Sequence, residues 1–280
     1  MNNTFSFNRF KNLLLKDGKM YIRNFGTTLI VLCCMTAILW IITLLVGYTA
    51  IGSSRLAIIA ASTAFAMLLA PSKVYGNANL SREGVGFAML PASSLEKFIS
   101  MFIYCAIVTP IVAFFGGYLI DALLSLFPFG GFEKPIHLYT LNDLARNMAS
   151  DTEGVVQMGA ANVDIKDVFP IGVIRTSFYM GIIQWAAIFM LGNMLFKKHK
   201  AGKTFACYLG IGYLLSVIMG VTMFANSRRV ELWFRSMENY SPEQTVQLWH
   251  NTTILGMVVA IIITVVLLYF TYRKIKTQKY

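Results

Sequence analysis

Histidine and cysteine are the residue types here that could hold a metal ion, and their placement argues against such a site. The three histidines fall in three separate polar segments: His137, His199 and His250. Zinc ligands usually include pairs a few residues apart, and this sequence offers no such pair of histidines. The four cysteines all fall inside apolar runs: Cys33, Cys34, Cys105 and Cys207. We therefore expect no metal site and no disulfide framework.

The tetrapeptide AGKT at residues 201–204 looks like the end of a phosphate-binding loop. In the full motif, G-x-x-x-x-G-K-[ST], the first glycine would stand at position 197. That position is Lys197, and no strand precedes it. The tetrapeptide is better explained as a basic turn between two apolar runs. If ATP drives this protein, the nucleotide binds to another chain.

The elements that carry these residues are expected to be membrane helices. Apolar residues make up 56% of the 280 residues, and the mean hydropathy is +0.61. Both values are high for a soluble domain. A helix needs about 20 residues to cross about 30 Å of hydrocarbon. Six runs can do so: residues 25–48, 56–74, 98–127, 171–196, 205–225 and 253–272. The sequence predicts an all-α integral membrane protein with a six-helix transmembrane bundle.

Basic residues are distributed unevenly between the two sides of this bundle. Six crossings put both termini on one side, and 16 of the 24 basic residues fall there: Arg9, Lys11, Lys16, Lys19, Arg23, Lys73, Arg82, Lys97, Lys197, Lys198, Lys200, Lys203, Arg273, Lys274, Lys276 and Lys279. Short cytoplasmic loops are enriched in Lys and Arg. We expect both termini in the cytoplasm, in a bacterial-type inner membrane. Anionic membrane lipids then account for the net charge of +11, and no nucleic acid partner is expected.

Ionisable residues are missing from the middle of all six runs. Asp121 and Arg175 stand near the outer ends of the third and fourth runs. Buried charges usually mark proton or ion pathways, so an ion-coupled carrier or an intramembrane protease is poorly supported. Gln184 and Asn193 in the fourth run could line a path, although hydrogen bonds within the bundle explain them as well. We expect that the chain is not an enzyme by itself.

Residues 1–24 read as an amphipathic interface helix on the cytoplasmic side, and residues 273–280 as a basic tail. One side of the helix is apolar: Phe10, Leu13, Leu14, and Met20 or Tyr21. The opposite side is polar: Arg9, Lys11, Asn12, Lys16 and Lys19. The basic region and the apolar run that follows are both too long for a cleavable signal peptide.

Two outer segments and one packing face complete the organisation. Residues 128–170 form a long outer loop, and residues 226–251 a shorter one with an amphipathic helix near Val230 and a restart at SPEQ. In the fifth run, Gly212, Ser216 and Gly220 repeat every four residues and let another helix approach closely. That helix could belong to this chain or to a second copy.

Between the second and third runs lies a segment, residues 76–97, that we name the elbow. Ser93 is followed three residues later by Glu96, the pattern of a capping box in which each side chain accepts a backbone N–H at a helix start. Pro91 stands just before it. The pattern predicts an ordered turn that starts the third run and sets its direction.

The topology and the elbow together resemble the permease subunits of the ABC-2 type transporter family. The local match consists of Arg82-Glu83, then Leu90-Pro91, then Ser93-Ser94-Leu95-Glu96-Lys97, which is similar to the family's acidic residue, LP-x-S step and Lys. The sequence departs from the family in the loop between the third and fourth runs, which is the longest outer loop here and is commonly short in such permeases.

This resemblance implies a mechanism. The elbow would be a coupling helix in a cleft of a separate ABC ATPase subunit, which binds ATP and Mg²⁺, so this chain needs no cofactor. The force would pass through six residues: Glu83, Leu90, Pro91, Ser93, Glu96 and Lys97. A second permease copy or a homologous permease would complete the translocation path. Two alternatives stay open: a non-transporting polytopic membrane protein with an interaction or regulatory role, and a channel or membrane-bound enzyme.

Overall fold

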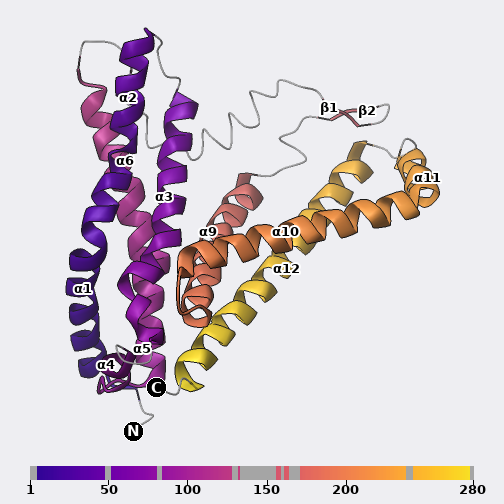
Figure 1. Ribbon diagram of the computed structural model, residues 1–280. Coiled ribbons are helices and arrows are strands. Elements are labelled where there is room, and N and C mark those ends of the chain that lie inside the picture. Colours follow the sequence, from indigo (N-terminus) through magenta and orange to yellow (C-terminus); the bar gives the residue numbers. More distant parts are fainter. Residues whose placement is uncertain are drawn as a thin grey trace. The chain divides into compact units, whose positions relative to one another are not determined.

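The computed structural model describes residues 5–47, 52–80, 84–127, 132, 156–158, 161–163, 171–237 and 242–277 (Figure 1). The chain divides into two compact units. The first unit contains residues 1–137, 182–205 and 264–280, and the second contains residues 138–181 and 206–263. Three long helices contribute residues to both units: α9 (Ile171–Leu195), α10 (Lys200–Ala225) and α12 (Pro242–Thr277).

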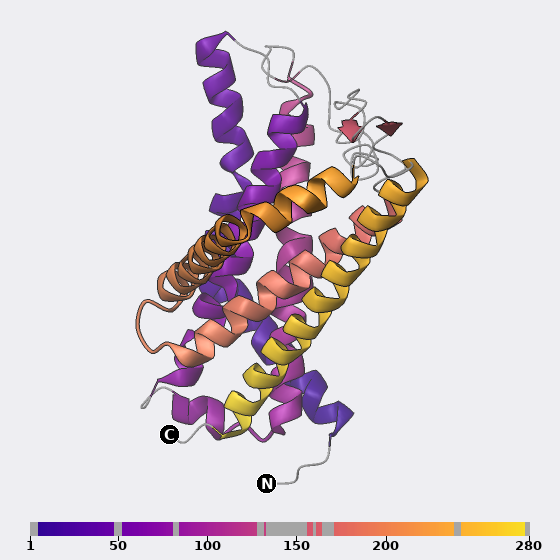
Figure 2. The same ribbon diagram turned by 90° about the vertical axis from the view of Figure 1, so that its right-hand side faces the viewer.

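The rest of the first unit is built from elements of the N-terminal half of the chain. They are α1 (Phe7–Cys33), α2 (Met35–Val46), α3 (Gly52–Val74), the 3₁₀ turn η1 (Gly76–Asn79), α4 (Gly84–Ala88), α5 (Ser94–Phe102), the π-helical segment η2 (Ile103–Val108) and α6 (Thr109–Leu124). α5, η2 and α6 follow one another without a break. The start of α1, the end of α12 and the elbow lie at the same end of this unit (Figures 1 and 2).

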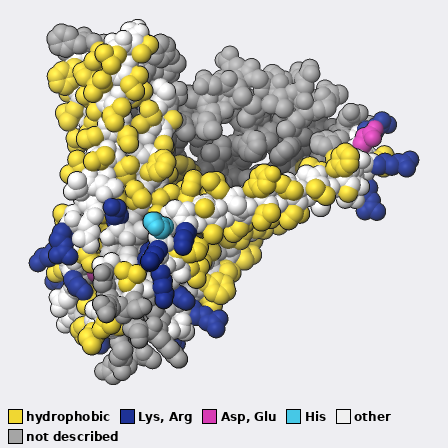
Figure 3. Space-filling model, viewed as in Figure 1, with side chains coloured by type: hydrophobic (Ala, Val, Ile, Leu, Met, Phe, Trp, Pro, Cys, Tyr) yellow, Lys and Arg dark blue, Asp and Glu magenta, His cyan; other side chains and the backbone are white. Residues whose placement is uncertain are grey.

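Its core is apolar and draws on four long helices. Phe25 of α1, Ala70 of α3, Met101 of α5 and Met190 of α9 are all fully buried in one cluster. Gly117 lets α6 approach α3 closely, because a Cβ added there would lie 3.3 Å from the side chain of Ile59. In Figure 3, apolar side chains cover much of the length of this unit, and Lys and Arg gather around the end where the elbow lies.

Six helices of the described chain are long and apolar enough to cross a membrane. They are 7–46 (α1 with α2), 54–74, 94–124, 176–195, 200–225 and 250–277. Each contains most of one of the six predicted runs. The second run is the weakest by sequence, because it is short and rich in alanine, and it nevertheless forms a helix with nearly half of its residues buried.

The N-terminal helix differs from the prediction of a separate interface helix over residues 1–24. α1 continues without interruption from Phe7 to Cys33 and packs lengthwise on α3 and α6. The reason is a continuous stripe of buried side chains that crosses the predicted boundary: Leu13, Asp17, Tyr21, Phe25, Leu29, Leu32 and Cys33. This spacing of three and four residues keeps one face against the bundle. The helix is interrupted instead at Cys34, between α1 and α2.

The third long helix contains a π-helical segment that the sequence did not predict. The hydroxyl of Thr109 donates to the carbonyl oxygen of Tyr104 at 2.7 Å, five residues back, and accepts from the hydroxyl of Tyr21 at 3.2 Å. Pro110 follows directly, and it has no N–H for the carbonyl four residues before it. The wider π turn provides a local hydrogen-bond pattern that accommodates this proline.

The second unit contains a strand pair, α11 (Ser227–Met237) and the remaining parts of α9, α10 and α12. Strand β1 (Val156–Met158) pairs antiparallel with β2 (Ala161–Val163), with Gln157 opposite Asn162. The sequence did not predict these strands, and most of the predicted loop 128–170 lies outside the described residues. The expected helix near Val230 is confirmed as α11, and the restart at SPEQ is confirmed by the start of α12 at Pro242.

Candidate functional site

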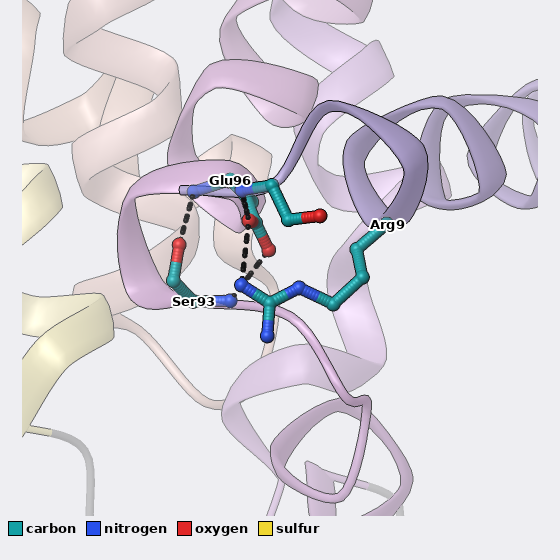
Figure 4. A network of polar contacts seen from close by, with 4 residues as sticks. Arg9, Ser93 and Glu96 are labelled. Carbon is teal, nitrogen blue, oxygen red and sulfur yellow. Dashed lines mark hydrogen bonds and ion pairs between the residues drawn. The ribbon is translucent and has the colours of Figure 1, made fainter. Parts of the chain in front are cut away.

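The elbow contains the capping box that the sequence predicts. Ser93 has an extended backbone (φ −67°, ψ 158°), and its hydroxyl oxygen accepts a hydrogen bond from the backbone N–H of Glu96 at 3.2 Å. The carboxylate of Glu96 accepts in return from the backbone N–H of Ser93 at 2.7 Å (Figure 4). Both side chains are buried. The box therefore fixes the point at which α5 begins.

Glu96 also holds the start of α1. Its other carboxylate oxygen accepts from the backbone N–H of Ser6 at 2.7 Å and from the guanidinium of Arg9 at 3.3 Å. Figure 4 shows Ser93 and Arg9 meeting this one carboxylate from two different elements. The Glu96 side chain is fully buried, while that of Arg9 is one-third exposed. One carboxylate thus joins two segments about 90 residues apart in the sequence.

Lys97 closes the elbow on itself. Its ammonium donates to the carbonyl oxygens of Phe87 at 2.7 Å and of Ala88 at 3.1 Å. These are the last two residues of α4, where unpaired carbonyls favour a cation. The ammonium also lies 5.2 Å from the centre of the Phe87 ring. Lys97 is buried, so this cation serves the shape of the elbow.

The beginning of the elbow is joined to the junction between α9 and α10. The side-chain amide of Asn79 donates to three carbonyl oxygens at the end of α9: Asn193 at 3.3 Å, Met194 at 2.9 Å and Phe196 at 2.9 Å. The ammonium of Lys200, the first residue of α10, donates to the carbonyl oxygen of Gly76. Asn79 therefore caps α9 from outside that helix.

A buried carboxylate on α1 lies beside the elbow. Asp17 accepts hydrogen bonds from the hydroxyl of Ser100 at 2.6 Å and from that of Tyr75 at 3.0 Å. All three side chains are buried. Burial, together with the nearby charge of Asp17, raises the pKa of the Tyr75 phenol well above its ordinary value. Tyr75 is thus held neutral and remains a donor to Asp17.

The six residues predicted to transmit force divide into three groups. Ser93, Glu96 and Lys97 are buried and bonded as above. Leu90 is half-buried and Pro91 is exposed. Glu83 lies outside the described residues.

The elbow exposes several apolar side chains beside its buried polar contacts. Met89 is 79% exposed and Leu95 is 43% exposed. We call Met89, Leu90, Pro91 and Leu95 the tip. Ser93, Glu96 and Lys97 are buried and hold the shape of the elbow, whereas Met89, Pro91 and Leu95 of the tip are exposed.

An ion pair at the opposite end of the first unit was not foreseen. Arg55 of α3 donates to both carboxylate oxygens of Asp121 of α6, at 2.9 and 2.5 Å. Their side chains are 3% and 0% exposed, and the guanidinium carbon lies 4.0 Å from the centre of the Phe132 ring. The sequence held a signal for this pair, because opposite charges stand at the outer ends of two consecutive runs.

The remaining predicted residues stay predictions. Gly212, Ser216 and Gly220 lie on the exposed part of α10, with no atom within 4 Å of a Cβ built at either glycine. Gln184 on α9 is half-buried. Asn193 is fully buried and donates to the carbonyl oxygen of Tyr75 at 3.3 Å, so it takes part in the α9 junction.

Comparisons with known proteins do not assign this chain to a group. No family model, no curated protein and no solved structure matches it. Among the described residues, no group of three or more His, Cys, Asp or Glu side chains could hold a metal ion.

Proposed function

We propose that this chain is the permease subunit of an ATP-driven transporter of the ABC-2 type, coupled to a separate ATPase through the elbow. One observation carries the proposal: the elbow is held rigidly by buried polar contacts and presents an apolar tip outward. An element that transmits force between subunits needs both properties. The permease would do no chemistry, since ATP and Mg²⁺ bind to the partner.

Rigidity is supported by the number of helices that the elbow contacts through polar side chains. Glu96 connects it to the start of α1, Asn79 to the end of α9, and Lys200 connects it to the start of α10. A displacement of the elbow would therefore move several long helices together. A flexible loop would absorb the same displacement by changing its own shape.

The docking surface in this proposal is the tip. Exposed apolar side chains outside hydrocarbon commonly mark contacts with a partner. Met89 is among the most exposed large apolar side chains of the described residues, and it stands next to Leu90 and Pro91. The partner would supply an apolar cleft of matching size.

The proposed location is a bacterial-type inner membrane, with the elbow in the cytoplasm. The elbow, the start of α1 and the end of α12 lie at one end of the first unit (Figure 2). Six helices long enough to cross a membrane would bring both chain ends to one side. The many Lys and Arg residues at that end suit the cytoplasmic side, where anionic lipids lie.

The first experiment is purification of the tagged protein from its native membrane in mild detergent, followed by mass spectrometry of the proteins that accompany it. We expect an ABC ATPase in near-stoichiometric amount. Recovery of the intact, folded protein without an ATPase would overturn the proposal. It would favour a polytopic membrane protein with an interaction or regulatory role.

A second experiment tests the tip itself. Met89→Asp places a charge on the proposed docking surface and, because Met89 is exposed, leaves the fold intact. Phe7→Asp is the matched control, since Phe7 is also an exposed apolar residue (71%) at the same end of the unit. We expect loss of the ATPase with Met89→Asp and retention with Phe7→Asp. Full retention with both would exclude the tip as the docking surface.

A further inference from the structure

A groove between α9 and α12 lies in the first unit, and none of its lining residues belongs to the elbow. It has a volume of about 310 Å³ and is lined by Leu191, Leu195, Phe270, Arg273, Lys274 and Thr277. Leu195 and Phe270 are each about half exposed, so the groove opens on the surface of the unit.

The lining changes from apolar to cationic in one direction. α9 and α12 both run toward the end where the elbow lies (Figure 1). On α12, Phe270 comes first and is followed by Arg273, Lys274 and Thr277, while α9 contributes the apolar Leu191 and Leu195. A phospholipid in the leaflet at that end has the same polarity, with acyl chains toward the membrane centre and phosphate at the surface.

The two cations are available to a ligand. Arg273 and Lys274 are exposed, and neither takes part in the ion pairs formed among the described residues. The lining contains no acidic side chain. The hydroxyl of Thr277 donates to the carbonyl oxygen of Arg273 at 2.9 Å, so recognition of an anion falls to the two cations.

From this gradient we infer that the groove binds one anionic phospholipid, with its phosphate at Arg273 and Lys274 and an acyl chain along Leu191, Leu195 and Phe270. Two positive charges favour a headgroup with net negative charge over a zwitterionic one, whose ammonium they repel. The inference does not depend on an ATPase partner. It assigns a specific lipid site in addition to the general attraction of the basic end for the membrane.

Native mass spectrometry of the full-length protein in detergent can test this site. The probes are dioleoyl phosphatidylglycerol, which is anionic, and dioleoyl phosphatidylcholine, which is zwitterionic. We expect the first phosphatidylglycerol to bind more tightly than the first phosphatidylcholine. Arg273→Ala with Lys274→Ala should weaken the binding of phosphatidylglycerol by about 25-fold, because each charge near the surface contributes about fivefold.

The matched control removes two charges from the same unit outside the groove. Lys203→Ala with Lys276→Ala does so, because both lysines are exposed and neither lines the groove. We expect this control to change the affinity for phosphatidylglycerol less than about twofold. An equal loss with both double variants would overturn the inference, since it would mean diffuse attraction.

A third pair of variants tests the apolar part. Leu195→Trp fills the groove without changing charge, and Leu119→Trp adds the same ring at a similarly exposed position on α6. Only Leu195→Trp should weaken the binding of phosphatidylglycerol. Unchanged binding would overturn the lipid assignment, and so would binding of inorganic phosphate that depends on both cations and is insensitive to Leu195→Trp.

Discussion

Replacing Glu96 by glutamine keeps the shape of the side chain and exchanges one acceptor oxygen for an amino group. In the native protein both oxygens accept: one from the backbone N–H of Ser93 at 2.7 Å, the other from Ser6 at 2.7 Å and Arg9 at 3.3 Å. A glutamine can satisfy only one side. On the other side, its amino group faces a buried N–H donor.

The expected cost follows from that mismatch. One buried N–H without an acceptor costs about 1–3 kcal/mol. Loss of the charge also weakens the hydrogen bonds that remain, since charge-assisted bonds are about twice as strong as neutral ones. The side chain of Arg9 is one-third exposed, so the loss of its ion pair with Glu96 adds little to this cost. We expect Glu96→Gln to destabilise the elbow by about 2 kcal/mol, which is about 30-fold in its opening equilibrium.

Hydrogen exchange of backbone amides measures this opening directly. In detergent, amide exchange at Ser93 or at Ser6 should accelerate by about 30-fold in Glu96→Gln. Ser93→Ala removes only the cap and should cost about 1 kcal/mol. Amides in the middle of α3 provide the internal reference. Native exchange rates at both Ser6 and Ser93 in Glu96→Gln would refute the role given to this carboxylate.

Three further predictions concern the first unit. Asp121→Asn should lower the free energy of unfolding by about 3 kcal/mol, because the buried Arg55 loses the charge of Asp121. The double variant Arg55→Met with Asp121→Leu should keep a free energy of unfolding near the native value, and equal losses for both variants in a detergent unfolding titration would contradict this. Gly192→Ala should destabilise the protein by about 1–3 kcal/mol, because the added Cβ would overlap the side chain of Thr204. Gly210→Ala on α10 should cause no such loss in thermal unfolding, because no atom lies within 4 Å of a Cβ added there. The contribution of Tyr75 to stability should be constant below about pH 10 and be lost above it, because the raised pKa of Tyr75 means that the unfolded chain loses this proton first. A pH titration of unfolding above about pH 10 should show a smaller fall in stability in Tyr75→Phe than in the native protein.

What the sequence could predict was local or periodic. The six apolar runs are long enough to be read directly, and all six correspond to helices. The capping box depends on two residues three positions apart, so Ser93 and Glu96 identify it without knowledge of the fold.

What it could not predict depends on contacts between distant residues. The bonds from Glu96 to Ser6 and Arg9 join positions 87 to 90 residues apart. In the sequence, Asn79 cannot be distinguished from other loop asparagines, because its role depends on the end of α9, which only the fold brings beside it. Asp17 is a lone acid among basic residues, and its buried hydrogen bonds with Ser100 and Tyr75, both distant in sequence, explain why an acid stands there.

The π-helical segment 103–108 has a consequence for how the length of this chain can change. One residue of an α-helix turns the helix by about 100°. Deleting or inserting one residue in the α-helical parts on either side would rotate α5 and the elbow by that angle relative to α6, whereas the wider π turn can absorb a one-residue change in length. The contacts of Glu96 with α1 and of Arg55 with Asp121 could then not both form. Single-residue insertions and deletions should be excluded between Glu96 and Asp121 except within the π segment 103–108, and a scanning library selected for stable expression would reveal this as a gap interrupted at that segment.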